Sequence, residues 1–332
     1  MRISLFTSLS LVALAVAAPQ KRSLPTAAEL DRFKLFAEWS ASAGCMTEGQ
    51  PAGTPVTCLA NQCDTVASHN ATVFSPSFTG TILDTRGYVA VDPVAKEIVL
   101  AFRGSVSTRN WVADFIFVQV PCDFTFGCLV HTGFLASWAE VKSRAMAAVI
   151  AARKANPTFK VSVTGYSLGA AVGTIAAAEI RRSLKIPVDL ITFGSPRVGN
   201  NAFAKFVTAQ AGAEYRLTHA NDPITRLPPI IFNYRHTSPE YWFDEGADGI
   251  ATLDEFTLCE GHANIKCNGG TGDFDMDKHG WYFQNFNGCS PPSTPFKTRN
   301  TEISDAEIAK IVNEWVKADK VLAKNLELGG EA

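Results

Sequence analysis

The sequence has little charge and no excess of either sign. Its 30 Lys and Arg residues against 32 Asp and Glu residues give a net charge of −2, and charged residues make up 19% of the 332-residue chain, below the roughly 25% of an average protein. A nucleic-acid-binding protein needs a basic surface, so we expect no nucleic-acid partner. Disordered chains are poor in apolar residues, whereas 46% of this chain is hydrophobic. The composition therefore predicts a folded protein with a large core.

The sequence also lacks an apolar run of the roughly 20 residues needed to cross a bilayer. The stretch from Leu5 to Val16 is shorter, and it lies between Arg2 and a group of small residues, which is the pattern of a signal peptide. We expect residues 1–18 to be a signal peptide and 19–22 a short propeptide that ends at the dibasic pair Lys21-Arg22. Alternatively, the dibasic pair is only solvated surface. The mature protein should be secreted and have no transmembrane segment.

The eight cysteines lack the paired CxxC spacing of a metal site, so we expect no bound metal. In an exported chain they indicate four disulfides, for which sequence alone leaves 105 pairings. Three pairs are close in sequence, which would leave the other two cysteines as a clasp between the ends of the domain. The expected pairs are Cys58 with Cys63, Cys122 with Cys128, Cys259 with Cys267, and Cys45 with Cys289.

One surface modification is predicted. Asn70-Ala71-Thr72 is an N-glycosylation sequon, whereas the proline after Asn156 blocks the other candidate. We expect a glycan on Asn70.

Strands and helices alternate from about residue 87 onward, without an internal repeat or a low-complexity block. Segments rich in β-branched and aromatic residues indicate strands, and apolar residues at helical spacing indicate helices. This alternation predicts a mostly parallel or mixed sheet flanked by helices. The expected strands are 87–91, 97–102, 114–120, 159–164, 188–193 and 214–219, and the expected helices are 131–154, 167–183 and 202–210.

The segment Gly165-Tyr166-Ser167-Leu168-Gly169 directly follows one predicted strand and opens a predicted helix. A strand-to-helix turn tight enough to expose a serine oxygen needs small residues on both sides, because a Cβ there would collide with the backbone. The helix N-terminus also offers N–H groups to a developing oxyanion. We therefore predict that Ser167 is a nucleophile; a serine that only caps the helix is the alternative.

A nucleophilic serine needs a base, and the base needs a third group that orients it. For this type of turn the order along the chain is serine, acid, histidine. Asp222 follows the strand 214–219 and so lies at the edge of the sheet where Ser167 emerges, whereas Asp189 lies near the start of its strand, at the opposite edge. A turn-forming aspartate before proline is the alternative reading of Asp222.

The residues alone do not decide which histidine is the base. His236, His262 and His279 all follow Asp222. His279 has one advantage, because the aromatic residues after it can anchor its loop in the core while its ring stays free to turn. His131 and His219 break the expected order, which favours structural roles for both.

Several motifs, taken together and in order, resemble one family. They are Ala101-Phe102-Arg103-Gly104-Ser105, Asn110-Trp111, Val130-His131-Thr132-Gly133-Phe134, the segment 165–169, Gly194-Ser195-Pro196-Arg197-Val198-Gly199, His219-Ala220-Asn221-Asp222-Pro223 and His279-Gly280-Trp281-Tyr282-Phe283. From about Leu30 to Cys289 the chain resembles the fungal class 3 lipases, which are secreted α/β-hydrolases that cleave acylglycerols. It departs from their pattern at Tyr166, Thr225 and Gly280, beside the three reacting groups.

The resemblance implies an α/β-hydrolase fold, with a predominantly parallel mixed sheet flanked by helices and a short helical lid, over residues 23–289. It implies a catalytic triad of Ser167, Asp222 and His279. The oxyanion hole would use the backbone N–H of Leu168 together with the N–H and hydroxyl of Ser105. The family's cysteine framework supports the four disulfide pairs given above.

The activity implied is that of a secreted triacylglycerol lipase, a serine ester hydrolase that works through an acyl-enzyme. The alternatives within the family are a mono- or diacylglycerol lipase and a feruloyl-type esterase. We expect a monomer that meets acylglycerols at a lipid–water interface and uses neither a metal nor an organic cofactor.

The segment after Ser105 matches the position of the family's lid. Trp111 and Val112 lie beside the polar residues Arg109 and Asn110, so a short amphipathic helix could cover the pocket in water and turn its apolar side toward lipid. Opening such a lid in water exposes apolar surface, which costs about 25 cal/mol per Å². We therefore expect interfacial activation; an ordinary helix packed on the sheet is the alternative.

Residues 290–332 leave the family pattern. Residues 290–295 are rich in proline and serine and indicate a linker. A helix is expected from Asp305 to about Asn325, with Ser304 and Glu307 as its capping box. Its apolar stripe needs a partner, which is the enzyme body, the mouth of the active site or a lipid surface.

Overall fold

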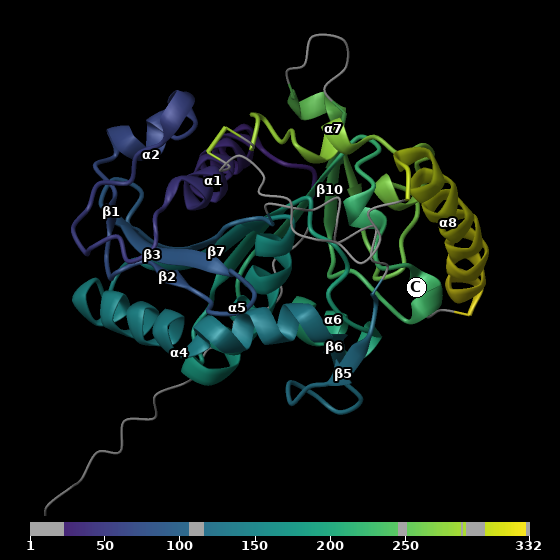
Figure 1. Cartoon of the computed structure of the whole chain (residues 1–332), viewed down its shortest axis with the longest axis horizontal. Helices are drawn as coiled ribbons and strands as arrows, with labels where there is room; N and C mark the ends of the chain where they lie inside the picture. Colours follow the sequence, from purple (N-terminus) through teal and green to yellow (C-terminus); the bar gives the residue numbers. More distant parts are fainter. Residues whose placement is uncertain (1–22, 106–115, 245–250, 287, 290–302, 330–332) are drawn as a thin grey trace, which may run out of the picture.

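Nine of the strands that the computed structural model describes form one sheet, shown in Figure 1. The model describes residues 23–105, 116–244, 251–286, 288–289 and 303–329. The strand order is β1-β3-β4-β7-β8-β9-β10-β11, and β2 pairs with β3 beside this path. The strands are β1 (Thr72–Val73), β2 (Phe78–Thr79), β3 (Arg86–Asp92), β4 (Glu97–Phe102), β7 (Lys160–Tyr166), β8 (Asp189–Phe193), β9 (Glu214–His219), β10 (Glu240–Phe243) and β11 (Phe256–Cys259).

The centre of the sheet is parallel from β4 through β7, β8 and β9 to β10. The pairs of β3 with β4 and of β10 with β11 are antiparallel. All six residues of β4 are buried, as expected for strands covered on both faces. The predicted mostly parallel mixed sheet is therefore confirmed.

Helices cover both faces of the sheet (Figure 1). One core lies between the sheet and α1, and a second lies between the sheet and α4 and α5. The helices are α1 (Ala27–Cys45), α2 (Asp64–Ser68), α4 (Thr132–Ala155), α5 (Leu168–Leu184), α6 (Asn201–Thr208), α7 (Met276–His279) and α8 (Asp305–Leu328). Short 3₁₀ turns are η1 (Leu59–Asn61), η2 (Ile224–Arg226), η3 (Ile230–Phe232), η4 (Leu253–Glu255) and η5 (Asn268–Gly270). None of the described helices is both long and apolar enough to cross a membrane.

The predicted strand 114–120 is wrong at residues 116–118 and is confirmed at residues 119 and 120, which begin a shorter strand. Residues 116–118 form no regular structure, and β5 (Gln119–Pro121) pairs with β6 (Leu129–His131) in a separate small sheet. The apolar side chain of Phe117 packs on Trp315 of α8 and on Phe232. An apolar run that packs on a distant helix has the same composition as a buried strand, so pattern alone did not separate the two.

Four disulfides connect the chain in the predicted pairs: Cys45 with Cys289, Cys58 with Cys63, Cys122 with Cys128, and Cys259 with Cys267. The first spans 244 residues and joins the end of α1 to the segment after His279. It therefore links the two ends of the core domain.

Helix α8, drawn in yellow in Figure 1, lies at the side of the molecule opposite α2 and β1. Its apolar face is buried against the body of the domain, since Ile308, Val312 and Val316 share a core cluster with Ile224 and Leu227. Of the three partners considered for its stripe, the structure shows the enzyme body. The predicted signal peptide, propeptide, lid segment with Trp111 and Val112, and linker lie outside the described residues.

Candidate active site

Ser167 lies at the turn from β7 into α5, with φ at 54° and ψ at −122°. Such positive φ is uncommon for residues other than glycine and often marks a functional turn. A Cβ on Gly165 would lie 2.3 Å from the carbonyl oxygen of Gly169, and a Cβ on Gly169 would lie 2.4 Å from that of Phe102. The two glycines therefore allow the close backbone approach that holds the serine on this turn.

The structure brings Ser167, His279 and Asp222 together although they are far apart in the chain. His279 Nε2 lies 2.9 Å from Ser167 Oγ, and His279 Nδ1 lies 2.9 Å from Asp222 Oδ2. A carboxylate only accepts hydrogen bonds, so Nδ1 carries the hydrogen and Nε2 is left to accept from the serine hydroxyl. Serine, histidine and aspartate are thus aligned for proton transfer away from Ser167 Oγ.

These three side chains extend from the carboxyl ends of three different elements. Ser167 follows β7, Asp222 follows β9, and His279 ends the short helix α7. Gly194, which follows β8 with φ at +57°, lies between them: a Cβ there would be 3.0 Å from the His279 ring and 3.1 Å from Asp222 Oδ2. The absence of a side chain at this position leaves room for the histidine and the acid to meet.

The carboxylate of Asp222 is fully buried, yet it is held in its charged form. Burial by itself raises the pKa of Asp222, but the charge and hydrogen bond of His279, the Tyr282 hydroxyl and the Ile224 amide outweigh it and bring the pKa below the ordinary 3.8. The Ile224 amide donates to Oδ1 at 2.8 Å. An ionised acid beside the imidazole can stabilise the imidazolium that forms when the histidine takes a proton.

The other candidate residues make different contacts. His236 Nε2 lies 2.6 Å from the carbonyl oxygen of Thr225, and His262 Nδ1 lies 2.9 Å from that of His236. Asp189 pairs with Arg32 at 3.0 Å, at the amino end of β8 and so at the opposite edge of the sheet from Ser167. Of the three histidines, His279 is the one that the structure joins to Ser167 and Asp222.

The two histidines predicted to be structural both bond to the backbone. His131 caps α4 by accepting from the Gly133 amide at 3.1 Å, and its Nε2 lies 2.9 Å from the carbonyl oxygen of Ile116. His219 Nδ1 lies 2.9 Å from the carbonyl oxygen of Lys278, next to the base. His219 therefore helps to hold the segment that carries the base.

The residues predicted for the oxyanion hole lie on the two sides of the turn. Leu168 is the first residue of α5, and the helix itself cannot satisfy its backbone N–H. Ser105 follows Gly104, where a Cβ would lie 2.8 Å from the Tyr166 ring. Arg103 fixes the same segment through Asp84 at 2.6 Å. The end of β4 is thereby packed against the turn that carries Ser167.

Two supporting contacts were missed from the sequence. The Tyr282 hydroxyl donates to Asp222 Oδ2 at 2.6 Å, although its place in an aromatic run predicted only an anchor in the core. Thr225, where the resembled family has proline, donates its hydroxyl to the carbonyl oxygen of Asp222 at 3.0 Å and also bonds to Asn268. The departure from the family pattern was a signal that could have pointed to this second contact.

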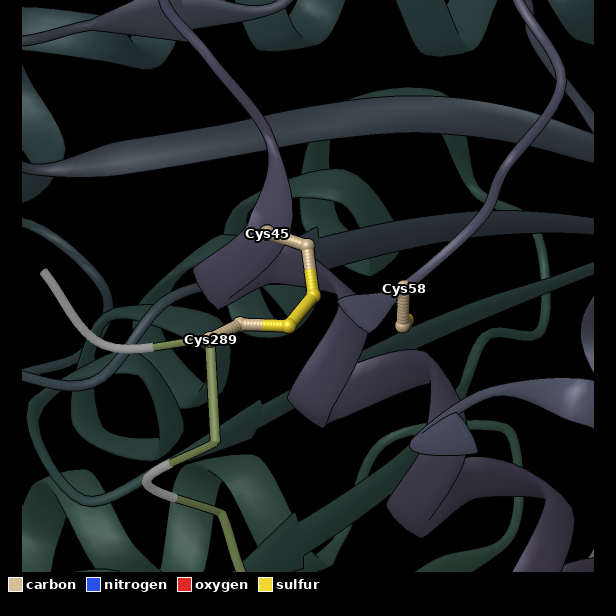
Figure 2. Close-up of side chains that lie close together, drawn as sticks. All are labelled: Cys45, Cys58 and Cys289. Atoms are coloured by element: carbon tan, nitrogen blue, oxygen red, sulfur yellow. A yellow bond between two sulfur atoms is a disulfide. The ribbon is translucent and has the colours of Figure 1, made fainter. Parts of the chain in front are cut away.

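One group of three possible metal ligands occurs among the described residues, and Figure 2 shows it: the sulfur atoms of Cys45, Cys58 and Cys289 lie within 4.8 Å of one another. All three sulfurs belong to disulfides. A metal ligand must be a thiolate, so this group does not fit a metal ion.

Comparison with known proteins gives consistent matches. Residues 99–232 match the family described as Lipase (class 3). The secreted mono- and diacylglycerol lipase 1 of Fusarium solani is 47% identical over 302 residues, which cover 91% of this chain and 89% of that protein.

Solved structures are similar as well. The mono- and diacylglycerol lipase of Aspergillus oryzae has a TM-score of 0.73 and 35% identity, covering 80% of this chain and 100% of that one. A triacylglycerol lipase, described as having a serine protease triad at its catalytic centre, has a TM-score of 0.70 and 32% identity over 80% of this chain and 98% of that one. With the sheet order described above, these matches confirm the expected α/β-hydrolase fold.

Proposed function

The chain belongs to the fungal class 3 lipase family, whose members are carboxylic-ester hydrolases, and from that premise we propose that it is a secreted lipase that cleaves mono- and diacylglycerols. The observation that carries the chemistry is the 2.9 Å contact of His279 with both Ser167 and Asp222. The Fusarium solani relative is named as a secreted mono- and diacylglycerol lipase, which supports both the substrate class and the extracellular location proposed for this chain. The predicted signal peptide supports that location too.

In this mechanism, His279 Nε2 takes the proton of Ser167 as Oγ attacks the ester carbonyl carbon. Asp222 stabilises the imidazolium, and the oxyanion of the tetrahedral intermediate is held by the N–H of Leu168 and by Ser105. The imidazolium then gives its proton to the departing glycerol oxygen, which leaves an acyl-enzyme on Ser167. Water, deprotonated by His279, attacks the acyl carbon and releases the fatty acid. Each oxyanion donor supplies about 3 to 4 kcal/mol to these transition states.

Triacylglycerol hydrolysis is the second candidate. It is favoured by the likeness to a triacylglycerol lipase at 32% identity, whereas mono- and diacylglycerol lipase relatives are more similar to this chain. The decisive assay compares monoolein, diolein, triolein, a phospholipid and methyl ferulate side by side, with Ser167→Ala as control. Hydrolysis of monoolein and diolein above triolein, lost in Ser167→Ala, supports the proposal. Preference for triolein would favour the second candidate, and preference for methyl ferulate would overturn both.

Access to the site supports the proposed lid. Ser167 and His279 are each only 2% exposed, which is the burial expected of a site that a lid closes. We propose, from the sequence alone, that the segment with Trp111 and Val112 is this lid. The rate on a short-chain ester should rise sharply as the ester passes its solubility limit, and a rate that follows simple saturation through that point would contradict the lid.

The glycan proposed at Asn70 has a suitable position. Asn70 is exposed at the end of a turn that precedes β1. A loss of apparent mass on treatment with an N-glycosidase, absent in Asn70→Gln, would establish the modification.

A further inference from the structure

Helix α8 shares one core cluster with residues from both segments that carry the partners of Ser167. Ile308, Val312 and Val316 on its apolar face are buried with Ile224 and Leu227, which follow Asp222 closely in the chain. Phe274 and Met276 pack against the same cluster, and Met276 begins the short helix that ends at His279. Helix α8 is thus part of the same apolar cluster as the segments that present the acid and the base.

A buried carboxylate fastens the helix to the loop after the acid. Asp319 of α8 is 2% exposed. Its Oδ2 accepts from the Ile230 amide at 2.8 Å and its Oδ1 from the Ile231 amide at 2.9 Å. These amides open η3, where the turn itself leaves them without partners. The carboxylate therefore fixes the backbone of this loop at two successive residues.

Arg197 extends the connection toward Asp222. Its Nη1 lies 3.3 Å from Asp319 Oδ2 and donates to the carbonyl oxygens of Arg226 at 2.5 Å and Pro228 at 2.9 Å. The backbone amide of Arg197 also donates to the carbonyl oxygen of Leu227 at 2.8 Å. The loop that begins at Asp222 is thus held at several points by two side chains that are themselves paired.

The charges of Arg197 and Asp319 oppose separation of α8 from the rest of the molecule. Arg197 and Asp319 are both almost wholly buried, and burial lowers the pKa of Arg197 to about 10, which the charge of Asp319 opposes. Separating α8 from the body would leave a cation without its partner in the interior, which is strongly unfavourable. A reversible cover over the active site would not be held by such a pair.

We propose that α8 is a positioning element for ester hydrolysis: Asp319, through Arg197 and the amides of Ile230 and Ile231, fixes the loop on which Asp222 meets His279. The inference rests on the proposed function. Asp319 acts on the reaction through other residues and does not touch the reacting atoms. The last link runs through Ile224, whose side chain packs under α8 and whose amide donates to the Asp222 carboxylate.

The test is Asp319→Asn in the full chain, assayed on a soluble p-nitrophenyl ester. The substitution keeps the shape of the side chain but removes the charge that balances Arg197. Because small misplacements of a catalytic group lower rates strongly, we expect kcat per active site, counted by titration with a phosphonate ester, to fall about tenfold. KM should stay within about a factor of two, because the substituted group does not contact the ester.

The matched control is Glu314→Gln, which removes an exposed carboxylate from the same helix and should leave kcat and KM unchanged. Unfolding in urea is measured for each variant. A lower unfolding midpoint of Asp319→Asn with an unchanged kcat per titrated site would overturn the proposal, because α8 would then only stabilise the fold. If Asp319→Asn does not fold, Val316→Ala loosens the same packing and is judged by the same two outcomes. Absence of activity in the wild-type protein would refute the proposed function instead.

Discussion

The hydroxyl of Tyr282 donates a hydrogen bond of 2.6 Å to Asp222 Oδ2, the same oxygen that faces His279 Nδ1. Tyr282 is buried, and burial together with the Asp222 charge holds its pKa well above 10. The tyrosine therefore stays protonated and remains a donor. Because Oδ2 accepts from both residues, the tyrosine fixes the direction from which the carboxylate meets the imidazole.

Removing this hydroxyl should slow the reaction without unfolding the protein. Tyr282→Phe keeps the ring packed against Phe193 and Phe243 but takes away one donor to a buried charge, which is typically worth about 1.5 to 3 kcal/mol. We expect kcat on a soluble ester to fall about tenfold, since only part of that energy concerns the transition state. Stopped assays at saturating ester check this. A kcat equal to that of the wild type would mean that His279 and Ile224 orient the acid unaided.

The close backbone contact beneath Ser167 predicts a difference between two glycines of α5. A Cβ on Gly169 would lie 2.4 Å from the carbonyl oxygen of Phe102, whereas the nearest atom to a Cβ on Gly173 is a Val163 methyl at 3.3 Å. Gly169→Ala should lower the free energy of unfolding by about 2 to 4 kcal/mol and reduce activity. Gly173→Ala should be tolerated, because helical alanine is intrinsically favoured. Equal unfolding midpoints in urea would refute the role of this contact.

Much of the fold could be predicted because the centre of the sheet is parallel and buried. Its strands are apolar runs bounded by helices of clear periodicity, and β4 and β9 have the predicted bounds. The rule that ligands meet the carboxyl ends of such strands separated Asp222 from Asp189. The choice of His279 over His236 and His262 needed the resemblance to a family, because each follows the acid and the aromatic residues after His279 favoured it without deciding the choice.

The rest depended on contacts between segments far apart in the chain. The run 116–118 predicted a strand, but its partner is α8, almost 200 residues later. The apolar stripe on α8 predicted that the helix packs against a partner, but it did not indicate which surface that partner is. In the sequence, Asp319 looks like any other charged residue of α8. Its burial follows from contacts that only the fold creates, with Arg197 and with the two backbone amides that open η3.

Two buried histidines predict how stability depends on pH. Burial, and then the charges of Arg216 and Arg197, hold the pKa of His236 well below its ordinary value of 6.5; burial also lowers the pKa of His131, against a hydrogen bond to Ile116. Below pH 6.5 the unfolded chain therefore binds protons that the folded chain does not. The contribution of these two histidines to the free energy of unfolding is therefore complete above pH 6.5. It is lost as the pH falls, by up to about 1.4 kcal/mol per pH unit for each histidine.

Urea midpoints at pH 5, 6 and 7 test this linkage. Carboxyl groups with a lowered pKa, such as Asp84 and Glu179, act in the same direction at lower pH. They are common to the wild type and to His236→Gln, so the difference between the two proteins isolates His236. His236→Gln should reduce the slope of the free energy of unfolding against pH by the equivalent of close to one proton. This holds whatever the effect of the substitution on stability at pH 7. An identical slope in His236→Gln and the wild type would show that His236 binds its proton equally well in both states.

The long disulfide should stabilise the fold far more than a short one. Cys45 and Cys289 close a loop of 244 residues, whereas Cys58 and Cys63 close a loop of 5. In the chain-entropy model, closing these loops raises the free energy of unfolding by about 5.5 kcal/mol and about 2 kcal/mol, respectively. Replacing Cys45 and Cys289 together by serine should therefore lower the urea midpoint more than the same change at Cys58 and Cys63. Cys58 lies beside Cys45 and Cys289 (Figure 2), so the two changes are made in the same region of the molecule. Equal losses from the two changes would reject loop closure as the cause.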